Sequence, residues 1–239
     1  MAIAIVLAGG SGSRMKSDVA KQFLILKEKE LLYYSLKTFQ ENENISKIIL
    51  VTREEDIDFC RTNIVEKYGF TKVKTICSGG IERYNSVYNG LCLVKSVSDD
   101  LKNEIVMIHD GARPFVTHAM INESVETIKG HHSACTIGVP VKDTIKVVFE
   151  HQGEIIGKET PDRSTLYQIQ TPQTFRYELI MMAYERMLKD ENHNITDDTM
   201  IVEQYAGMGS RILMGSYENI KITTPEDLQI AEKIVEKNL

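Results

Sequence analysis

The sequence predicts an α/β protein built on a single doubly wound, mostly parallel sheet. Stretches with strand and helix patterns alternate along most of the 239 residues. The first strand, Ala2 to Ala8, is an unbroken apolar run, which is typical of a parallel strand buried on both faces. No internal repeat or interdomain linker interrupts this order, so we expect residues 1–239 to form a single domain.

The alternation can be followed element by element through the first part of the chain. Apolar runs bounded by turn residues predict strands, and stretches with one apolar face predict helices. After the first strand we expect helix 31–39, strand 45–51, helix 54–68, strand 72–77, helix 82–97, strand 104–109, helix 119–129 and strand 134–139. Right-handed crossovers would place these helices on both faces of a Rossmann-like sheet.

The pattern changes after Pro140. Residues 144–148 and 155–158 flank a turn and predict a β-hairpin, so we expect residues 141–166 to project as an arm. The remaining expected elements are strand 167–169, helices 175–188 and 197–205, strand 211–215 and helix 225–237. Thr224, Pro225 and Asp227 form a typical start for that last helix.

The composition restricts the class of protein. A net charge of −6 argues against a general nucleic-acid binder, which usually carries a basic face. The four cysteines lack the spacing of a zinc or redox site, which suits a reducing compartment. No apolar run approaches the length of a membrane span, and Met1 runs straight into the first strand without a signal peptide. We therefore expect a cytoplasmic protein that binds neither nucleic acid nor membrane.

A glycine-rich loop directly follows the first strand. It contains Gly9, Gly10 and Gly12, and Arg14 and Lys21 follow. Glycines let backbone amides surround phosphate oxygens, and the two cations would add positive charge at the same mouth. The loop therefore predicts a binding site for a triphosphate.

Two common phosphate-binding loops do not fit this segment. A Walker A loop requires Lys-Ser or Lys-Thr after its last glycine, and no glycine here is followed by either pair. A dinucleotide fingerprint requires a third glycine where Met15 stands. An ordinary βα turn with surface cations stays open as a structural alternative.

Seven further segments, in register over nearly the whole chain, resemble one enzyme family. The loop has the form L-A-G-G-x-G-x-R-M followed by Lys-Gln, which is similar to the nucleotide-binding loop of sugar-phosphate nucleotidyltransferases. The other segments resemble one branch of this superfamily, the cytidylyltransferases that include 2-C-methyl-D-erythritol 4-phosphate cytidylyltransferase. These segments are 79–83 with Ser86, 109–115, 139–146, 162–163, 171–173, 196–198 and 219–228. Ala20 stands where this family often has proline and Ile81 where it often has aspartate, but neither departure removes a charged group.

The resemblance implies transfer of CMP from CTP to 2-C-methyl-D-erythritol 4-phosphate, with release of pyrophosphate and with Mg²⁺ as cofactor. The catalytic residues it implies are Arg14, Lys21, Arg163 and Lys221. The nucleotide would be bound by Ala8, Gly9, Gly10, Ser11, Gly12, Gly80, Arg83, Ser86, Asp110 and Ala112. The acceptor would be bound by Asp110, Arg113, Thr144, Arg163, Thr171 and Lys221, and Asp110 would also hold the metal. The arm would cross to a second subunit and form a homodimer.

This reaction needs no general base, because a phosphate monoester loses its second proton at a pKa of about 6. Catalysis would then rest on positioning and electrostatic stabilisation. We accordingly expect His109 to pack at a strand end. Asp197 and Asp198 precede a predicted helix, where capping and dipole stabilisation are favoured over metal binding.

Two alternatives stay open at this stage. Ribitol 5-phosphate is used as the acceptor by close relatives. A non-catalytic nucleotide sensor on the same fold would be expected to lose Arg14, Lys21 or Lys221, and the chain retains all three.

Overall fold

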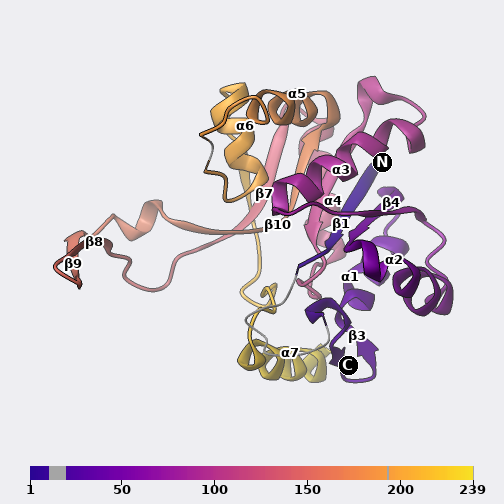
Figure 1. Ribbon diagram of the computed structural model, residues 1–239, viewed down its shortest axis with the longest axis horizontal. Helices are drawn as coiled ribbons and strands as arrows, with labels where there is room; N and C mark the ends of the chain where they lie inside the picture. Colours follow the sequence, from indigo (N-terminus) through magenta and orange to yellow (C-terminus); the bar gives the residue numbers. More distant parts are fainter. Residues whose placement is uncertain (11–19, 193, 239) are drawn as a thin grey trace.

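We describe a computed structural model of the protein, which places residues 1–10, 20–192 and 194–238 (Figure 1). A seven-stranded sheet has the order β11-β7-β10-β6-β1-β4-β5. Its strands are β1 (Ala2–Ala8), β4 (Ile45–Thr52), β5 (Val73–Ser78), β6 (Ile105–Asp110), β7 (Ala134–Pro140), β10 (Tyr167–Arg176) and β11 (Arg211–Met214). Only β10 runs antiparallel to its neighbours, β6 and β7. The predicted doubly wound, mostly parallel sheet is confirmed.

The two faces of the sheet are covered by different helices (Figure 1). The apolar side chains of α1 (Leu31–Glu41) and α4 (His118–Lys129) share one core with Ala2, Ala4 and Val6. Those of α3 (Arg83–Val97), α5 (Tyr177–Met187) and α6 (Asp198–Ala206) share a second core with Ile3 and Ile5. Alternate residues of β1 therefore face opposite layers, which explains why its sequence is apolar throughout.

A smaller third core lies beside the main sheet. The closing helix α7 (Pro225–Asn238) packs there against Leu26 of the short strand β2 (Ile25–Leu26), which pairs with β3 (Lys29–Glu30). Neither short strand was predicted from the sequence. Ile222, just before α7, is fully buried in the same cluster. This packing fixes the segment that carries Lys221.

Gly90 sets the distance between α3 and the sheet. A Cβ atom at this position would lie 2.7 Å from Ile5 Cγ2 and 3.2 Å from Val51 Cγ2. We expect Gly90→Ala to lower the free energy of unfolding by about 1–3 kcal/mol through overpacking, although alanine is the better helix former. Urea unfolding would measure this, with Ser96→Ala on the exposed side of α3 as the control. Equal stability of the two variants would contradict the close packing.

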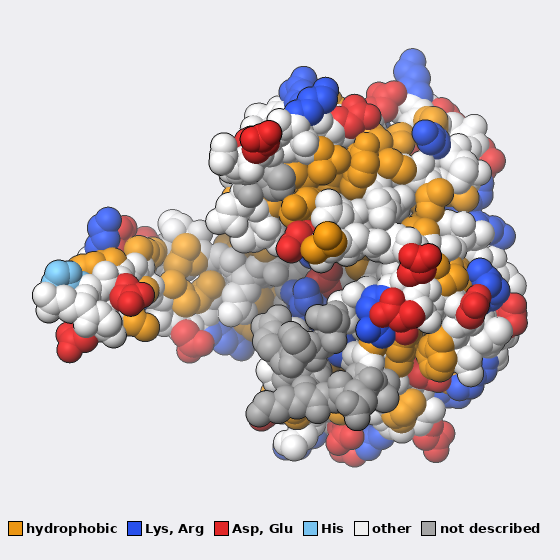
Figure 2. Space-filling view, viewed as in Figure 1, with side chains coloured by type: hydrophobic (Ala, Val, Ile, Leu, Met, Phe, Trp, Pro, Cys, Tyr) orange, Lys and Arg blue, Asp and Glu red, His pale blue; other side chains and the backbone are white. Residues whose placement is uncertain are grey.

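The predicted hairpin projects away from the body as an arm. It consists of β8 (Val147–His151) and β9 (Glu154–Glu159), and every residue of both strands is exposed. Figure 2 shows hydrophobic side chains along it. Gln152 and Gly153 take positive φ angles of 51° and 81° at the tip, as tight hairpin turns require. Strand β8 begins at Val147, whereas the sequence pattern predicts that this strand begins three residues earlier, at residue 144.

Two further predictions differ from the structure. The helix expected from 54 is built of a 3₁₀ turn (Glu54–Asp56), α2 (Ile57–Phe59) and a π-helical turn (Cys60–Glu66). The helix expected from 175 begins only at Tyr177, because β10 continues to Arg176 and Phe175 is fully buried between β6 and β7. A search for apolar runs in the sequence misses most of this strand, because the strand contains polar residues and Pro172.

The other short helices are 3₁₀ turns at Lys21–Phe23, Leu101–Asn103 and Arg163–Thr165. Among the residues that the structure places, none of the helices has the length and apolar character to cross a membrane.

Candidate active site

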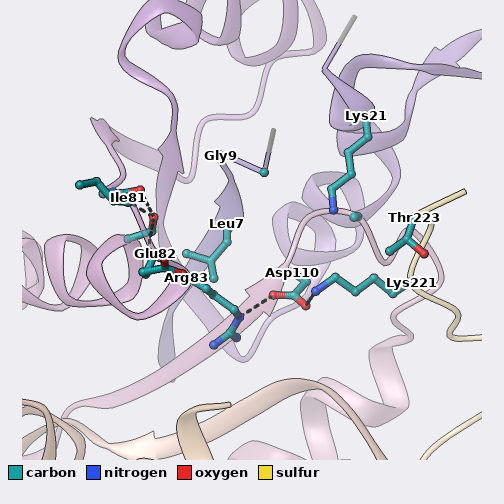
Figure 3. A pocket seen from close by; sticks show the side chains of 13 residues that line it. Leu7, Gly9, Lys21, Ile81, Glu82, Arg83, Asp110, Lys221 and Thr223 are labelled. Carbon is teal, nitrogen blue, oxygen red and sulfur yellow. Dashed lines mark hydrogen bonds and ion pairs between the residues drawn. The ribbon is translucent and has the colours of Figure 1, made fainter. Parts of the chain in front are cut away.

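A pocket of about 470 Å³ opens where β1 and β6 end (Figure 3). The register pairs Leu7 with Asp110, so the carboxyl ends of these neighbouring strands lie together. This is the edge at which open α/β sheets bind their ligands. The pocket is lined by Leu7, Gly9, Gly10, Lys21, Gly80, Ile81, Glu82, Arg83, Ser86, Asp110, Ala112, Lys221 and Thr223.

Asp110 lies between two cations at the floor of this pocket (Figure 3). Its Oδ1 accepts a hydrogen bond from Arg83 Nε at 3.2 Å, and its Oδ2 lies 2.7 Å from Lys221 Nζ. Burial would raise the pKa of Asp110, but the charges of Arg83 and Lys221 outweigh it and hold that pKa far below its usual value. Asp110 is therefore a carboxylate at any physiological pH.

A hydrogen-bonded chain beneath the pocket holds Asp110 in place. Thr171 Oγ1 accepts from the Asp110 backbone N–H at 3.1 Å and lies 3.1 Å from His109 Nδ1. The other ring nitrogen of His109, Nε2, lies 3.0 Å from the carbonyl oxygen of Arg113. An Nε2–H donor and an Nδ1 acceptor satisfy all three contacts with a neutral imidazole. His109 is fully buried against the ring of Phe39, so it packs at the strand end and does not line the pocket.

His109 makes the stability of the protein depend on pH. Burial lowers the pKa of His109 to about 4, although the neighbouring Asp110 charge opposes this. Between about pH 6.5 and pH 4 the unfolded chain binds a proton that the folded chain does not, so stability is full above this window and falls as the pH falls through it. We expect a loss of about 2 kcal/mol by about pH 5.

Urea unfolding of the wild type and of His109→Asn would measure this contribution. The variant is expected to be less stable near neutral pH, because Phe39 loses its ring partner. Its stability should nevertheless change less between neutral pH and about pH 5. Identical pH dependence in both proteins would contradict the assignment.

Arg83 joins the pocket to a buried carboxylate of α6. Its Nη1 and Nη2 donate to the two carboxylate oxygens of Asp198, at 3.0 and 2.8 Å. The expectation that Asp197 caps α6 is confirmed, since its side chain accepts from Met200 N. Asp198 does not cap the helix: it is the first residue of α6, where the helix dipole favours its charge as expected, and its fully buried side chain turns inward to Arg83.

The turn before α3 requires glycine. A Cβ atom at Gly80 would lie 2.4 Å from the Cβ atom of Asn85, and one at Gly79 would lie 2.5 Å from Ser86 Oγ. Ser86 Oγ accepts from Gly80 N at 3.0 Å, which holds the turn against the helix start. Ile81, on the rim, is 98% exposed. This wall of the pocket therefore presents backbone and one uncovered apolar side chain.

Lys21 and Lys221 enter the pocket from different parts of the chain (Figure 3). Lys21 begins the 3₁₀ turn after the glycine loop, and a Cβ atom at Gly10 would lie only 3.0 Å from its Cε. The lysine chain therefore lies directly over Gly10. Two lysine side chains in one pocket make it suitable for anions.

Comparison with known proteins identifies the family. The family model "IspD: 2-C-methyl-D-erythritol 4-phosphate cytidylyltransferase" matches residues 2–237. The chain belongs to the IspD family. Members of this family are cytidylyltransferases, a class of nucleotidyltransferase enzymes, so the family predicted from the sequence motifs is confirmed.

Relatives in the IspD family align over nearly the whole chain. The 2-C-methyl-D-erythritol 4-phosphate cytidylyltransferase of Clostridioides difficile (strain 630) is 49% identical, covering 97% of this chain and 92% of its own. The enzyme of that name from Clostridium botulinum (strain Langeland) is 47% identical over 98% and 96%.

Solved structures of the family share the fold. The 4-diphosphocytidyl-2C-methyl-D-erythritol synthase of Anaerococcus prevotii matches with a TM-score of 0.81 at 31% identity, covering 98% of this chain and 95% of that one. The IspD structure from Francisella tularensis matches with a TM-score of 0.78 at 28% identity, over 98% and 99%.

The pocket brings together most of the residues that the IspD motifs indicated. Those lining it are Gly9, Gly10, Lys21, Gly80, Arg83, Ser86, Asp110, Ala112 and Lys221. Ser11, Gly12 and Arg14 lie outside the described residues. Ala8 and Thr171 are buried beneath the pocket, and Arg113 donates from Nη1 to the Asn219 carbonyl at 2.8 Å. Burial lowers the pKa of Arg113.

Thr144 and Arg163 lie apart from this pocket. Both are exposed on the arm side of the chain, where Arg163 Nη1 donates to the carbonyl of Lys142 at 2.8 Å. Neither lines the pocket of its own chain. A role for them in catalysis therefore requires the pocket of another subunit.

The set of site residues predicted from the sequence lacked five residues of the site. Leu7, Ile81, Glu82 and Thr223 line the pocket, and each lies within two positions of a site residue that the motifs had indicated. Asp198 was noticed only as a possible cap. The residues around Asp198 in the sequence could not reveal its partner, Arg83, which lies 115 positions earlier in the chain.

The described residues contain no group of three or more His, Cys, Asp or Glu side chains that could hold a metal ion. Divalent cations are commonly used in the IspD family. A single hard carboxylate, Asp110, suits Mg²⁺ that keeps water and substrate oxygens as its other ligands.

Proposed function

We propose that this chain transfers CMP from CTP to 2-C-methyl-D-erythritol 4-phosphate. The products are 4-diphosphocytidyl-2-C-methyl-D-erythritol, a precursor in isoprenoid biosynthesis, and pyrophosphate. The observation that carries the proposal is the pocket itself, in which glycine segments and Lys21 face Asp110 and Lys221 on an IspD-family sheet. The relatives and structures named above all bear the name of this activity, so ribitol 5-phosphate is not favoured as the acceptor.

The pocket divides into a donor side and an acceptor side. On the donor side, Lys21 and Arg14 neutralise the triphosphate, and backbone at Ala8, Gly9, Gly10, Ser11, Gly12, Gly80, Arg83, Ser86 and Ala112 surrounds the nucleotide. On the acceptor side, Lys221 binds the phosphate, Asp110 orients the polyol, and Arg113 and Thr171 support them. The two lysines thus serve two different anions.

The reaction requires no proton transfer to the protein. A phosphate oxygen of the acceptor attacks the α-phosphorus of CTP, and the bond from that phosphorus to the oxygen bridging to the β-phosphorus breaks. Pyrophosphate leaves with that electron pair. The acceptor phosphate is largely a dianion above its second pKa of about 6, so it is already nucleophilic. His109 agrees with this scheme, since it is buried outside the pocket with a pKa of about 4.

Asp110 is the side chain that would hold Mg²⁺. The ion, when bound, neutralises triphosphate charge and lowers the repulsion between the two substrates. Lys221 Nζ lies 2.7 Å from Asp110 Oδ2. This lysine would therefore contact both the Asp110 carboxylate and the acceptor phosphate. Removal of divalent cations with a chelator is expected to abolish turnover, and added Mg²⁺ to restore it.

The arm, residues 141–166, is proposed to cross to a second copy of the chain and to bring Thr144 and Arg163 to its pocket. The apolar side chains of Val147, Val148, Phe149, Ile155 and Ile156 support this, because they are between 36% and 78% exposed on a hairpin without a core beneath it. Such a surface is typical of an obligate contact between subunits.

Mixed dimers would test this crossing. Arg163→Ala and Lys21→Ala are each expected to be nearly inactive. Refolded together, they should recover about a quarter of the wild-type activity, because half of the dimers are mixed and one of their two sites is intact. No recovery would place Arg163 in the pocket of its own chain or outside catalysis.

The activity itself is tested by pyrophosphate release from CTP with each acceptor. Release with methylerythritol phosphate and not with ribitol 5-phosphate supports the proposal. Preference for ribitol 5-phosphate would change the acceptor, and CTP binding without release from any polyol phosphate would indicate a nucleotide sensor.

A further inference from the structure

Arg83 holds two carboxylates with different surroundings. Its Nε donates to Asp110 Oδ1 in the pocket at 3.2 Å, while Nη1 and Nη2 donate to both oxygens of Asp198 at 3.0 and 2.8 Å. The paired contact with Asp198 is the shorter and the better defined of the two. In a planar guanidinium, such a bidentate pair fixes the plane and therefore also the direction of Nε.

Asp198 is itself held from several sides. Its side chain is fully buried, and Oδ1 accepts from the Tyr184 hydroxyl at 2.6 Å. Its backbone N–H donates to Gln173 Oε1 at 3.0 Å, and Gln173 Nε2 donates to Asp197 Oδ2 at 2.9 Å. Asp198 is also the first residue of α6, where the helix dipole favours a negative charge.

The buried pair has a geometric consequence for the pocket. A buried ion pair contributes little net stability, because desolvation offsets most of the attraction between its charges. Its effect here is to occupy the two terminal nitrogens of Arg83, so that only Nε reaches Asp110. Asp110 Oδ2 is then left to Lys221 and to a ligand. Without Asp198, Arg83 could turn its fork onto Asp110 and engage both oxygens.

We propose that Asp198 is a positioning residue for the acceptor side of the site. It acts through Arg83 to keep one oxygen of Asp110 available, and it does not touch substrate. The inference rests on the proposed cytidylyl transfer. The glycine backbone and Lys21 of the donor side are not part of this contact, so CTP binding depends on it less than acceptor binding does.

Steady-state kinetics of Asp198→Asn, on the full-length chain, tests the inference. This nearly isosteric change removes the charge and one acceptor. We expect kcat/KM for the acceptor to fall about tenfold to a hundredfold, a range typical of residues that orient a ligating side chain, while KM for CTP changes less than about twofold. Asp198→Glu retains the carboxylate and should recover part of the loss. Tyr184→Phe, which removes one hydrogen bond from Asp198, should show a smaller loss of the same kind.

A double-mutant cycle separates positioning from general destabilisation. In an Arg83→Ala background, Asp198→Asn should add little further loss of kcat/KM, because the residue through which it acts is gone. Thr117→Ala is the stability control, since it removes the side-chain cap of α4 and Thr117 does not line the pocket. The fraction of folded protein is measured for each variant by thermal unfolding. Equal losses in both Arg83 backgrounds, or a loss of activity that follows only the folded fraction, would overturn the inference.

A crystal structure of Asp198→Asn gives a readout that does not depend on activity. The expected result is a rotated Arg83 guanidinium that contacts both oxygens of Asp110. An unchanged Arg83, with only Nε at Asp110, would overturn the inference even if the variant were less active. If the wild type releases no pyrophosphate with any polyol phosphate, the proposed function fails, and this comparison still decides the role of Asp198.

Discussion

Lys21→Ala is expected to lower kcat by about two to three orders of magnitude, the loss typical of removing one preorganised group that stabilises transition-state charge. This loss of kcat is expected because of where the Lys21 side chain lies. It crosses Gly10 and points into the pocket (Figure 3). In the proposed reaction, charge would develop there on the α-phosphate and on the leaving pyrophosphate. Single-turnover pyrophosphate release at saturating CTP and acceptor would measure the loss in the chemical step.

Folding should be affected far less than turnover by this change. A partly exposed lysine at the start of a short 3₁₀ turn contributes at most about 1 kcal/mol to stability. Lys37→Ala is the matched control, because it removes a cation from the exposed face of α1, where Lys37 Nζ lies 3.9 Å from Glu41 Oε1. Wild-type turnover in Lys21→Ala would refute its assigned role, and so would a loss of the same size in the control.

Lys221→Ala is expected to lower kcat/KM for the acceptor by about two to three orders of magnitude, with a much smaller effect on KM for CTP. In the structure Lys221 is the cation nearest to Asp110 Oδ2, at 2.7 Å, and its segment is held by the buried Ile222. Loss of this cation also raises the pKa of Asp110 from its lowered position, because the charge and the hydrogen bond of Lys221 both help to hold it down. The initial rate as a function of acceptor concentration gives the expected change directly.

Lys237→Ala is the control for this second substitution. Lys237 lies near the end of α7 and pairs with Glu218 at 2.6 Å, so its removal changes the charge of the same region outside the pocket. It should retain wild-type kinetics. If Lys221→Ala raises KM for CTP and leaves the acceptor unaffected, the donor and acceptor sides of the pocket have been assigned the wrong way round.

Local patterns in the sequence were sufficient for much of the fold. The apolar run of β1, the helical stripes of α1 and α4 and the turn of the arm are each encoded within a few neighbouring residues. The antiparallel strand β10 was underestimated, because half of it reads as a polar loop. Gln173 and Thr174 are buried there, and their backbone pairs with β6 on one side and β7 on the other. A strand that is held mainly by backbone pairing with its neighbours has no strong apolar pattern in its own sequence.

The candidate site likewise has one part that local sequence patterns predicted and another that they did not. Anion binding by the glycine loop, with Arg14 and Lys21 as its cations, could be predicted from the sequence, because those residues are close together in the chain. The charged network of Arg83, Asp110, Asp198 and Lys221 became visible in the folded chain and not in the sequence. They come from α3, β6, α6 and the segment before α7, which meet because the strand order places the end of β6 beside that of β1. Contacts between distant segments depend on that order, and no local pattern encodes it.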